Sequence, residues 1–247
     1  MRRLIEIALA SGLAAGVAIA TFTSTVGRGP LDDALALEES LPHDHGGAGH
    51  EALMSRGVQE VGGLVGLVLF GLALGLIFMV VWAKVSKHLP ARTSIASTMQ
   101  LGAIGFVTVV LVPFVKYPAN PPAVGDPSTV DERTVQYLAV VAMSIVLTIV
   151  VWQVRRRLST GSDVRRAWLS TAAYAAGLAV IAFVLPESPD VVEAPTDLVW
   201  RFRLASLGAL ATGWLVLSLA SGTLLSGLER PAGQASPADE PDLVQAN

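Results

Sequence analysis

The chain of 247 residues is 52% hydrophobic and only 15% charged, with a net charge of −3 at pH 7. Because an ordinary soluble domain is about 25% charged, this composition excludes a typical water-soluble globular protein. The chain contains no cysteine, which excludes disulfides, thiolate metal sites and thiol catalysis. Its mean hydropathy of +0.58 instead indicates a protein that lies largely within a membrane.

Six apolar runs approach or exceed the length of about 20 residues that a helix needs to cross a bilayer. The runs are Leu4–Val26, Val61–Ala83, Ile95–Val115, Val135–Val154, Ala167–Leu185 and Leu204–Leu228. Only the first contains a charged residue, Glu6, whereas the buried helices of a soluble protein are usually shorter and amphipathic. The sequence therefore predicts an all-α integral membrane protein, with a bundle of about six transmembrane helices in residues 1–229.

The first run has a second interpretation. Arg2 and Arg3, the apolar stretch and the small residues Ala18 and Ala20 also fit a secretory signal with a cleavage site. Cleavage would leave five spans and would not move any later segment.

Basic residues predict the orientation. With the N-terminus in the cytoplasm, eleven of the 17 Lys and Arg residues fall in inside segments, although the outside segments are much longer. Both termini are therefore expected in the cytoplasm. Residues 230–247, rich in Pro, Ala, Asp, Glu and Gln, are expected to form a disordered cytoplasmic tail.

The predicted spans are nearly bare of ionisable side chains, which disfavours a proton-coupled transporter with a buried carboxylate relay. Their Ser and Thr residues are interpreted as bonding to the preceding helical turn. Pairs of small residues four apart suit close helix packing; they are Gly12/Gly16, Gly62/Gly66, Gly71/Gly75 and Ala209/Gly213.

The first predicted outside loop, residues 27–60, contains three of the four histidines of the chain within eight residues. Imidazoles and carboxylates together suit divalent ions such as Co²⁺, Ni²⁺ and Zn²⁺. The candidate metal ligands are His43, Asp44, His45, His50 and Glu51. The alternative is a solvated polar loop that binds metal only adventitiously.

The second predicted outside loop is rich in proline, which fixes φ and favours extended backbone in the residue before it. A rigid lip at the outer end of the third span is therefore expected. Its candidate residues are Lys116, Tyr117, Pro118, Asn120, Pro121, Pro122 and Asp126.

The third predicted outside loop carries an acidic strip beside two arginines: Glu187, Asp190, Glu193, Asp197, Arg201 and Arg203. Two interpretations are equally consistent with it. One is a cation vestibule closed by ion pairs; the other is an interfacial amphipathic segment anchored by Trp200.

Four strings of the sequence, Pro30–Glu39, Ser55–Gln59, Pro113–Asp126 and Trp200–Gly208, resemble the CbtA family of predicted cobalt transporter subunits. The string K-Y-P-A-N-P-P-A-V-G-D within the third of these is long and unusual. The resemblance runs from the first span to the last, and it departs from the family at Gly29, where many members are expected to have Glu. It implies a membrane subunit of a cobalt uptake system linked to cobalamin synthesis, with a small single-span companion, CbtB.

The resulting hypothesis is uptake of Co²⁺ across the plasma membrane of a prokaryote, with the outside histidines capturing the ion. No catalytic residues, no permanently bound cofactor and no nucleic-acid partner are expected, and the chain is not expected to be an enzyme. A nucleotide-binding motif is lacking, so any ATP-driven energy would come from a partner. The alternative is a membrane-embedded partner or regulatory protein that does not itself transport.

Overall fold

The computed structural model describes residues 1–40, 56–122, 124, 127–157, 162–188 and 194–229. Within them, six helices are long and apolar enough to cross a membrane, which confirms the predicted fold class. Five spans are single helices: α1 (Arg2–Thr25), α3 (Arg56–Val85), α6 (Val130–Arg157), α7 (Asp163–Val184) and α8 (Thr196–Glu229). The third span joins α4 (Ser94–Phe106), the π-helix η2 (Val107–Leu111) and α5 (Val112–Lys116). Helix α2 (Arg28–Ser40) and two 3₁₀ turns, η1 (Ser86–His88) and η3 (Pro127–Thr129), complete the described elements.

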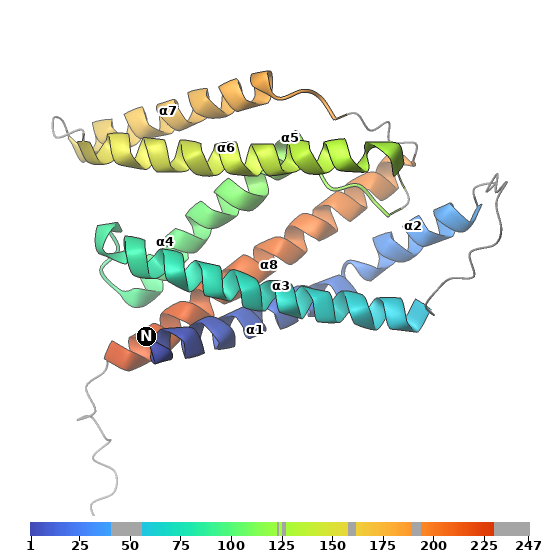
Figure 1. The fold of residues 1–247 in the computed structure, drawn as a ribbon, viewed down its shortest axis with the longest axis horizontal. Helices are drawn as coiled ribbons and strands as arrows, with labels where there is room; N and C mark the ends of the chain where they lie inside the picture. The colour runs from blue at the N-terminus through green and yellow to red at the C-terminus, as the bar shows by residue number, and fades with distance from the viewer. Residues whose placement is uncertain (41–55, 123, 125–126, 158–161, 189–193, 230–247) are drawn as a thin grey trace, which may run out of the picture.

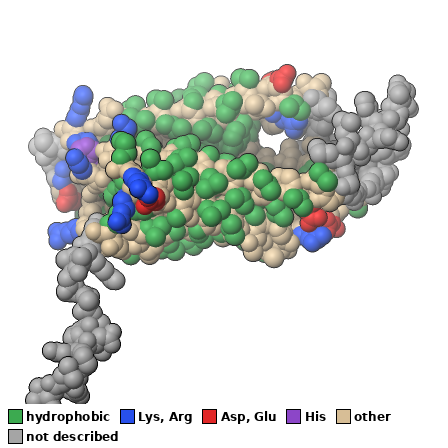
Figure 2. All heavy atoms as spheres, turned by 60° about the horizontal axis from the view of Figure 1, so that its bottom comes forward, with side chains coloured by type: hydrophobic (Ala, Val, Ile, Leu, Met, Phe, Trp, Pro, Cys, Tyr) green, Lys and Arg blue, Asp and Glu red, His purple; other side chains and the backbone are tan. Residues whose placement is uncertain are grey.

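The helices form a bundle with two distinct ends (Figure 1). The start of α1, η1, the end of α6, the start of α7 and the end of α8 lie at one end, here named the termini end. The α1–α2 junction, the segment between α5 and α6 and the start of α8 lie at the other, here named the proline-loop end. On the face shown in Figure 2, apolar side chains cover the middle of the molecule, as a bilayer requires, and basic side chains gather mostly at the termini end.

Glycines bring α1 and α3 into backbone contact. A Cβ added to Gly12 would lie 2.6 Å from the Gly71 carbonyl oxygen, and one added to Gly75 would lie 2.3 Å from the Ala8 oxygen. Any larger side chain would therefore force the two helices apart, as expected for small-residue packing in membranes. Two of the predicted glycine pairs, Gly12/Gly16 and Gly71/Gly75, thus form one interface. A Cβ at Gly62 or Gly66 would meet nothing within 4 Å, so that pair serves no contact among the residues that the structure describes.

Helix α1 is enclosed by α3 and α8. Ala15 is fully buried and Ile19 is 2% exposed, and Ile19 fits against Gly213 of α8. Such enclosure favours the six-span interpretation, because cleavage of α1 would expose the packed faces of two other helices.

Helix α8 also packs against α4 through small residues. A Cβ on Gly222 would lie 2.6 Å from Ile95 Cα, and Gly105 lies under the ring of Trp214. Trp214 in turn meets Phe78 of α3 edge to face, with 6.3 Å between the ring centroids. Helices α1, α3, α4 and α8 therefore form one packed unit.

The α6–α7 hairpin is attached to this unit over only part of its length. Helix α7 packs against α6, and α6 meets the unit through η2 and α5. Because the third span crosses from α8 to α6 along its length, the two layers separate toward the termini end (Figure 1).

Helix α2 differs from the loop expected for residues 27–60. Its Ala34 is 1% exposed, and the helix packs on α8. Arg28 pairs with Asp32 and with Glu60 of α3, at 3.7 and 3.8 Å. The helix was missed because it is short and its apolar face is narrow.

Candidate functional site

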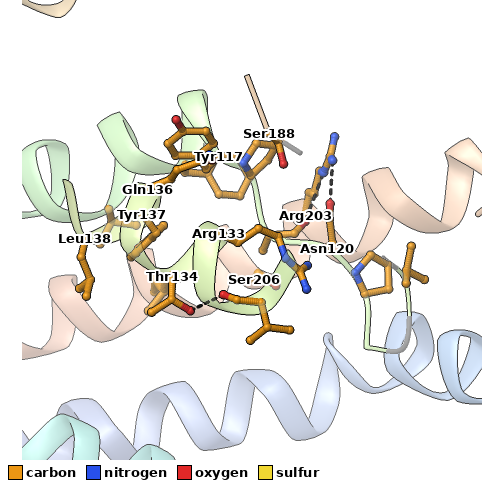
Figure 3. A pocket seen from close by; sticks show the side chains of 18 residues that line it. Tyr117, Asn120, Arg133, Thr134, Gln136, Tyr137, Leu138, Ser188, Arg203 and Ser206 are labelled. Carbon is orange, nitrogen blue, oxygen red and sulfur yellow. Dashed lines mark hydrogen bonds between the residues drawn. The ribbon is translucent and has the colours of Figure 1, made fainter. Parts of the chain in front are cut away.

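A cavity of about 640 Å³ opens at the proline-loop end, between the third span, α6 and α8 (Figure 3). We name it the proline-loop cavity. Its walls are built by residues of the segment after α5, by the first turns of α6 and by the first half of α8. The residues that the argument uses are Tyr117, Pro118, Asn120, Pro121, Arg133, Gln136, Tyr137, Arg203 and Ser206.

The segment after α5 is fixed to the neighbouring helices by side chains at its start. Lys116 Nζ donates to the Ala182 oxygen of α7 at 3.1 Å, and the Tyr117 hydroxyl donates to the Pro186 oxygen at 2.8 Å. Burial raises the pKa of Tyr117, so its hydroxyl keeps the proton that this bond needs. With Pro118 and Pro121 restricting the backbone that follows, this segment is a defined wall of the cavity.

Arg203 of α8 holds the same wall from the other side. Its Nε donates to the Ala119 oxygen at 3.2 Å, and its Nη2 donates to Asn120 Oδ1 at 2.9 Å. Both acceptors are neutral, and the guanidinium carbon lies 5.9 Å from the centroid of the Trp200 ring. The positive charge of Arg203 therefore stays largely uncompensated by these contacts.

Gln136 of α6 contributes a buried carbonyl oxygen. Its side chain is 7% exposed and lines the cavity, and Nε2 donates to Glu132 Oε1 at 2.9 Å. The opposite amide orientation would set two oxygens against each other, so the carboxylate partner fixes Nε2 as the donor. Gln136 Oε1 has no hydrogen-bond partner among the described residues. Such a buried oxygen is costly unless a water or ligand reaches it.

A second hollow, of about 530 Å³, lies toward the termini end between the packed unit and α6. We name it the apolar groove. Phe78, Leu101, Trp152 and Trp214 contribute to its almost entirely apolar walls, and His88 lies among the few polar residues. The groove exists because η2 contacts α6 and the two helices α4 and α6 diverge from that contact toward the termini end (Figure 1).

The two hollows approach each other at the interruption of the third span. In α8, Leu210 lines the cavity and Trp214 lines the groove; four residues correspond to about 6 Å of helix rise. In η2, Val110 faces the cavity and Thr108 the groove. Along α8 and η2, the residues that line the two hollows therefore lie within about one helical turn of each other.

Pro113 explains why this layer is irregular. In η2 the Val112 N–H donates to the Val107 oxygen, five residues back, whereas in an α-helix it would donate to the Thr108 oxygen. The next donor in that register would be Pro113, which has no N–H. The Ser144 hydroxyl of α6 takes its place and donates to the Thr108 oxygen at 2.6 Å.

Hydroxyls extend this contact to α7. The Thr108 and Thr148 Oγ1 atoms lie 2.9 Å apart, and Thr148 Oγ1 lies 3.4 Å from the Tyr174 hydroxyl oxygen. We name Thr108, Ser144, Thr148 and Tyr174 the hydroxyl cluster. For Thr21, Ser24, Ser170, Thr212 and Ser218 the structure agrees with the expected bonds to the preceding turn.

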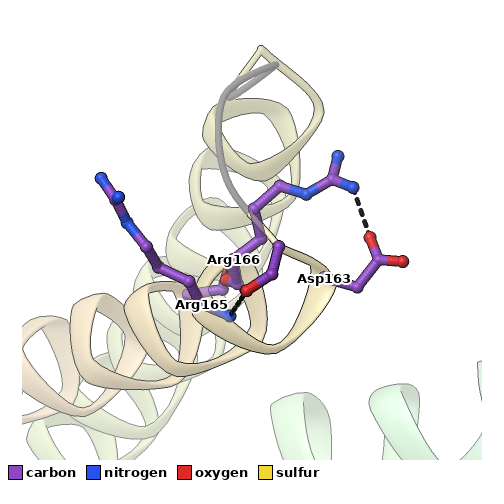
Figure 4. A network of polar contacts seen from close by, with 5 residues as sticks. Asp163, Arg165 and Arg166 are labelled. Atoms are coloured by element: carbon purple, nitrogen blue, oxygen red, sulfur yellow. Dashed lines mark hydrogen bonds and ion pairs between the residues drawn. The ribbon is translucent and has the colours of Figure 1, made fainter.

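The termini end carries local helix-capping contacts. Ser162 Oγ accepts from the Arg165 N–H at 3.3 Å and caps α7, and Arg166 pairs with Asp163 in the same first turn (Figure 4). Arg165 and Arg166 fit the basic bias of this end.

The residues expected to shape an outer entrance have different positions. Tyr117, Pro118, Asn120, Pro121 and Arg203 meet in the proline-loop cavity. Lys116 anchors the wall from outside, and Pro122 and Glu187 are exposed.

Arg201 pairs with Asp197 in α8 and with Asp33 of α2, both at 2.9 Å, and so points away from the cavity. Asp126, Asp190 and Glu193 lie outside the described residues, as do the candidate metal ligands His43, Asp44, His45, His50 and Glu51. In the part of the chain that the structure describes, no group of three or more His, Asp or Glu side chains is placed to hold a metal.

Arg133, Gln136, Tyr137 and Ser206 were missed as cavity residues. Each is a single polar or aromatic residue in or beside an apolar run, and the helix face that it occupies cannot be read from such a pattern. Only the charge of Arg133 at the start of the fourth span was a usable signal.

Comparison with known families decides the identity of the chain. The model of the CbtA family, described as a probable cobalt transporter subunit, matches residues 1–226. The chain belongs to the CbtA family. The match covers the first five spans, the sixth as far as residue 226, and the described residues of the proline-loop cavity, the apolar groove and the hydroxyl cluster. A search of the curated proteins and a search of the solved structures found no match.

Membership in CbtA fits the fold. A transporter subunit must cross the bilayer, and this chain has six helices able to do so, which together indicate a multi-pass membrane protein. The description as a subunit also implies a partner.

Proposed function

We propose that this CbtA protein is the membrane subunit of a cobalt uptake system linked to cobalamin synthesis, in the plasma membrane of a prokaryote. The observation that carries the proposal is the pair of hollows in the bundle, a cavity at the proline-loop end and a groove toward the termini end that is lined by Thr108 and Thr148 of the hydroxyl cluster.

The termini end faces the cytoplasm in this proposal. It holds the basic residues of η1, of the end of α6 and of the start of α7, among them Lys87, Arg156 and Arg165. Enrichment of Lys and Arg in short inside segments supports that orientation. The proline-loop cavity then opens to the outside and the apolar groove toward the cytoplasm.

Metal capture would precede entry. His43, His45 and His50, helped by Asp44 and Glu51, are proposed to bind the ion before it reaches the proline-loop cavity. The wall from Lys116 to Asp126 and the strip from Glu187 to Arg203 are proposed to shape the entrance.

A single-span companion of the CbtB type is proposed as the partner. Supporting this, helix α7 packs mainly against α6, and just 6% of its most apolar window is buried inside the described part of the chain. Helices with so little contact in their own chain leave apolar surface to lipid or to a partner.

Cell-associated cobalt in a cobalt-starved host tests the function. The arms are the host alone, the chain, and the chain with its companion, each with membrane insertion checked. A rise in cobalt that requires the chain supports uptake. The triple variant His43→Ala, His45→Ala and His50→Ala is expected to need more external cobalt for the same uptake. Unchanged uptake in that variant would reject the capture role of the histidines alone.

The competing function is a membrane partner or regulatory protein that does not transport. The near absence of ionisable groups from the described spans favours it. Cobalt levels that stay at the host baseline, with the chain and its companion both inserted, would support this alternative and reject uptake.

A further inference from the structure

The apolar groove is accessible from the side, at the depth of the membrane spans. Ile77 and Val81 of α3 and Ile145 and Ile149 of α6 all line it. These four side chains are between 38% and 61% exposed, so the described part of the chain does not cover the groove. Its surroundings at this depth are hydrocarbon, which can enter it.

The length of the groove matches one leaflet of a bilayer. The lining residues run from Leu74 to Val85 in α3 and from Ile145 to Arg156 in α6, and both helices run toward the termini end (Figure 1). Each of these segments corresponds to about 16 Å of helix rise. One leaflet provides about 15 Å, half of the roughly 30 Å of hydrocarbon. The groove therefore extends from the middle of the membrane to the level of the headgroups.

The inner end of the groove requires no polar group from an occupant. Thr108 and Thr148 are its polar residues at this depth, and their Oγ1 atoms lie 2.9 Å apart in a hydrogen bond. Thr148 Oγ1 also lies 2.9 Å from the Ser144 oxygen of its own helix. An apolar chain can therefore lie against these hydroxyls without leaving them unpaired.

The outer end of the groove has the opposite chemistry. His88, Gln153 and Arg156 line it and are exposed, and the described lining contains no carboxylate. Arg156 lies between two further arginines, Arg155 and Arg157, in the last turn of α6. Because a guanidinium is always charged, this end attracts an anion. Basic pockets between spans at the level of the headgroups bind anionic lipids in this way.

The size of the groove separates a lipid tail from a helix. A helix with its side chains is about 10 Å across, so 16 Å of it fills roughly 1,200 Å³. The groove is about 530 Å³, which is too small to enclose such a segment. An acyl chain is a single file of methylene groups and fits lengthwise.

We propose that the apolar groove binds one anionic phospholipid from the leaflet at the termini end. One acyl chain lies between α3 and α6, and the phosphate accepts from Arg156, with Gln153 and His88 beside it. The lipid joins the packed unit to the α6–α7 hairpin where the two layers separate. This inference goes beyond the proposed function and holds for either orientation in the membrane.

Native mass spectrometry of the purified full chain, stripped of lipid in detergent, tests the inference. The probes are phosphatidylglycerol, phosphatidylcholine with the same acyl chains, and glycerol phosphate, which has no tail. The tail exchanges one apolar environment for another, so preference must come from the headgroup. One phosphatidylglycerol is expected to bind more tightly than phosphatidylcholine, and glycerol phosphate is expected to bind weakest.

A pair of arginine variants tests the headgroup contact. Arg156→Gln is expected to weaken binding of phosphatidylglycerol roughly 5-fold and to remove most of its advantage over phosphatidylcholine. Arg155→Gln is the matched control, because it removes the same charge from the same turn but Arg155 is not among the described lining residues. It is expected to change binding little.

A second pair tests the position of the tail. Ile149 and Val150 are 50% and 49% exposed, and only the first is among the described lining residues. Ile149→Trp fills the groove and is expected to weaken binding of both lipids, whereas Val150→Trp is expected to leave it unchanged. The Tm of each variant in detergent confirms that it is folded.

Four results would overturn the inference. They are equal binding of the two lipids, binding of glycerol phosphate as tight as that of phosphatidylglycerol, equal losses in the two arginine variants, and equal losses in the two tryptophan variants. A dimer that Ile149→Trp dissociates, with lipid binding unchanged, would instead assign the groove to a second copy of the chain. The measurement records lipid alone, so its result is independent of the cobalt uptake experiment.

Discussion

Ser144 replaces a backbone donor that Pro113 removes from the third span. The Ser144→Ala variant would leave the buried Thr108 oxygen without this bond, at a cost of about 1–3 kcal/mol. Thermal unfolding in detergent is expected to show a lower Tm. Ser170→Ala is the control, because the Ser170 hydroxyl bonds to the Arg166 oxygen of the preceding turn in its own helix, and it is expected to change the Tm little.

A rescue makes this prediction specific. Pro113→Ala restores a backbone N–H that can donate to the Thr108 oxygen. Ser144→Ala should therefore lower the Tm less in a Pro113→Ala background. Equal costs in both backgrounds would show that Ser144 does not act through the Thr108 carbonyl.

Tyr117 gives the proline-loop wall a defined response to pH. Its hydroxyl must be protonated to donate to the Pro186 oxygen, and burial raises its pKa in the folded state. The stabilisation is therefore complete below the unfolded pKa of about 10 and is lost as the pH rises through the higher folded pKa. The Tm of Tyr117→Phe is expected to lie below that of the wild type by a constant amount from pH 6 to 9. That difference should shrink above about pH 10, whereas a difference independent of pH would assign the effect to packing.

At the scale of the elements, glycines bring α1 and α3 into close contact. Gly75→Ala would set a Cβ 2.3 Å from the Ala8 oxygen, so the helices must separate, and a loss of about 1–3 kcal/mol is expected. Gly66→Ala in the same helix meets nothing within 4 Å and is expected to be neutral or slightly stabilising, since Ala is the better helix former. Fluorescence-detected size-exclusion chromatography after heating compares the two. Similar profiles would mean that α1 does not pack on α3 as described.

Predictability from the sequence also differs between elements. Each span is a run of about 20 apolar residues, and a bilayer leaves such a run little choice but a helix, so the fold class followed directly. Helix α2 and the π-helix η2 were not predicted, because both depend on contacts between helices. Ala34 of α2 is buried where α2 packs on α8, and the Ser144 hydroxyl of α6 replaces the backbone donor that Pro113 lacks.

The candidate site was predictable only where local chemistry marked it. Tyr117, Asn120 and Arg203 lie in a proline-rich loop or beside an acidic strip, both visible in the sequence. Gln136 and Ser206 belong to the same cavity, but their helix faces are known only once α6 and α8 are placed. Arg201 lies only two residues before Arg203 but pairs with Asp33, and the spacing of the two arginines does not predict which of them lines the cavity.

The whole molecule consists of a tightly packed unit and a hairpin attached near the proline-loop end. Helices α1, α3, α4 and α8 share backbone contacts through glycines, whereas α6 and α7 join them through η2, α5 and the hydroxyl cluster. Both hollows lie along the seam between these two parts.

That arrangement serves uptake only if the proline-loop end faces outward. The absence of cysteine from the chain permits a direct test with single cysteines at two exposed positions, Glu187→Cys at the proline-loop end and Lys87→Cys at the termini end. In intact cells, a maleimide that cannot cross the membrane is expected to label the first variant and not the second. Permeabilised cells should label both, which controls for access to each thiol. Labelling of Lys87→Cys alone in intact cells would show that the orientation in the membrane is the reverse of the one proposed. The proline-loop cavity would then open to the cytoplasm and the apolar groove toward the outside.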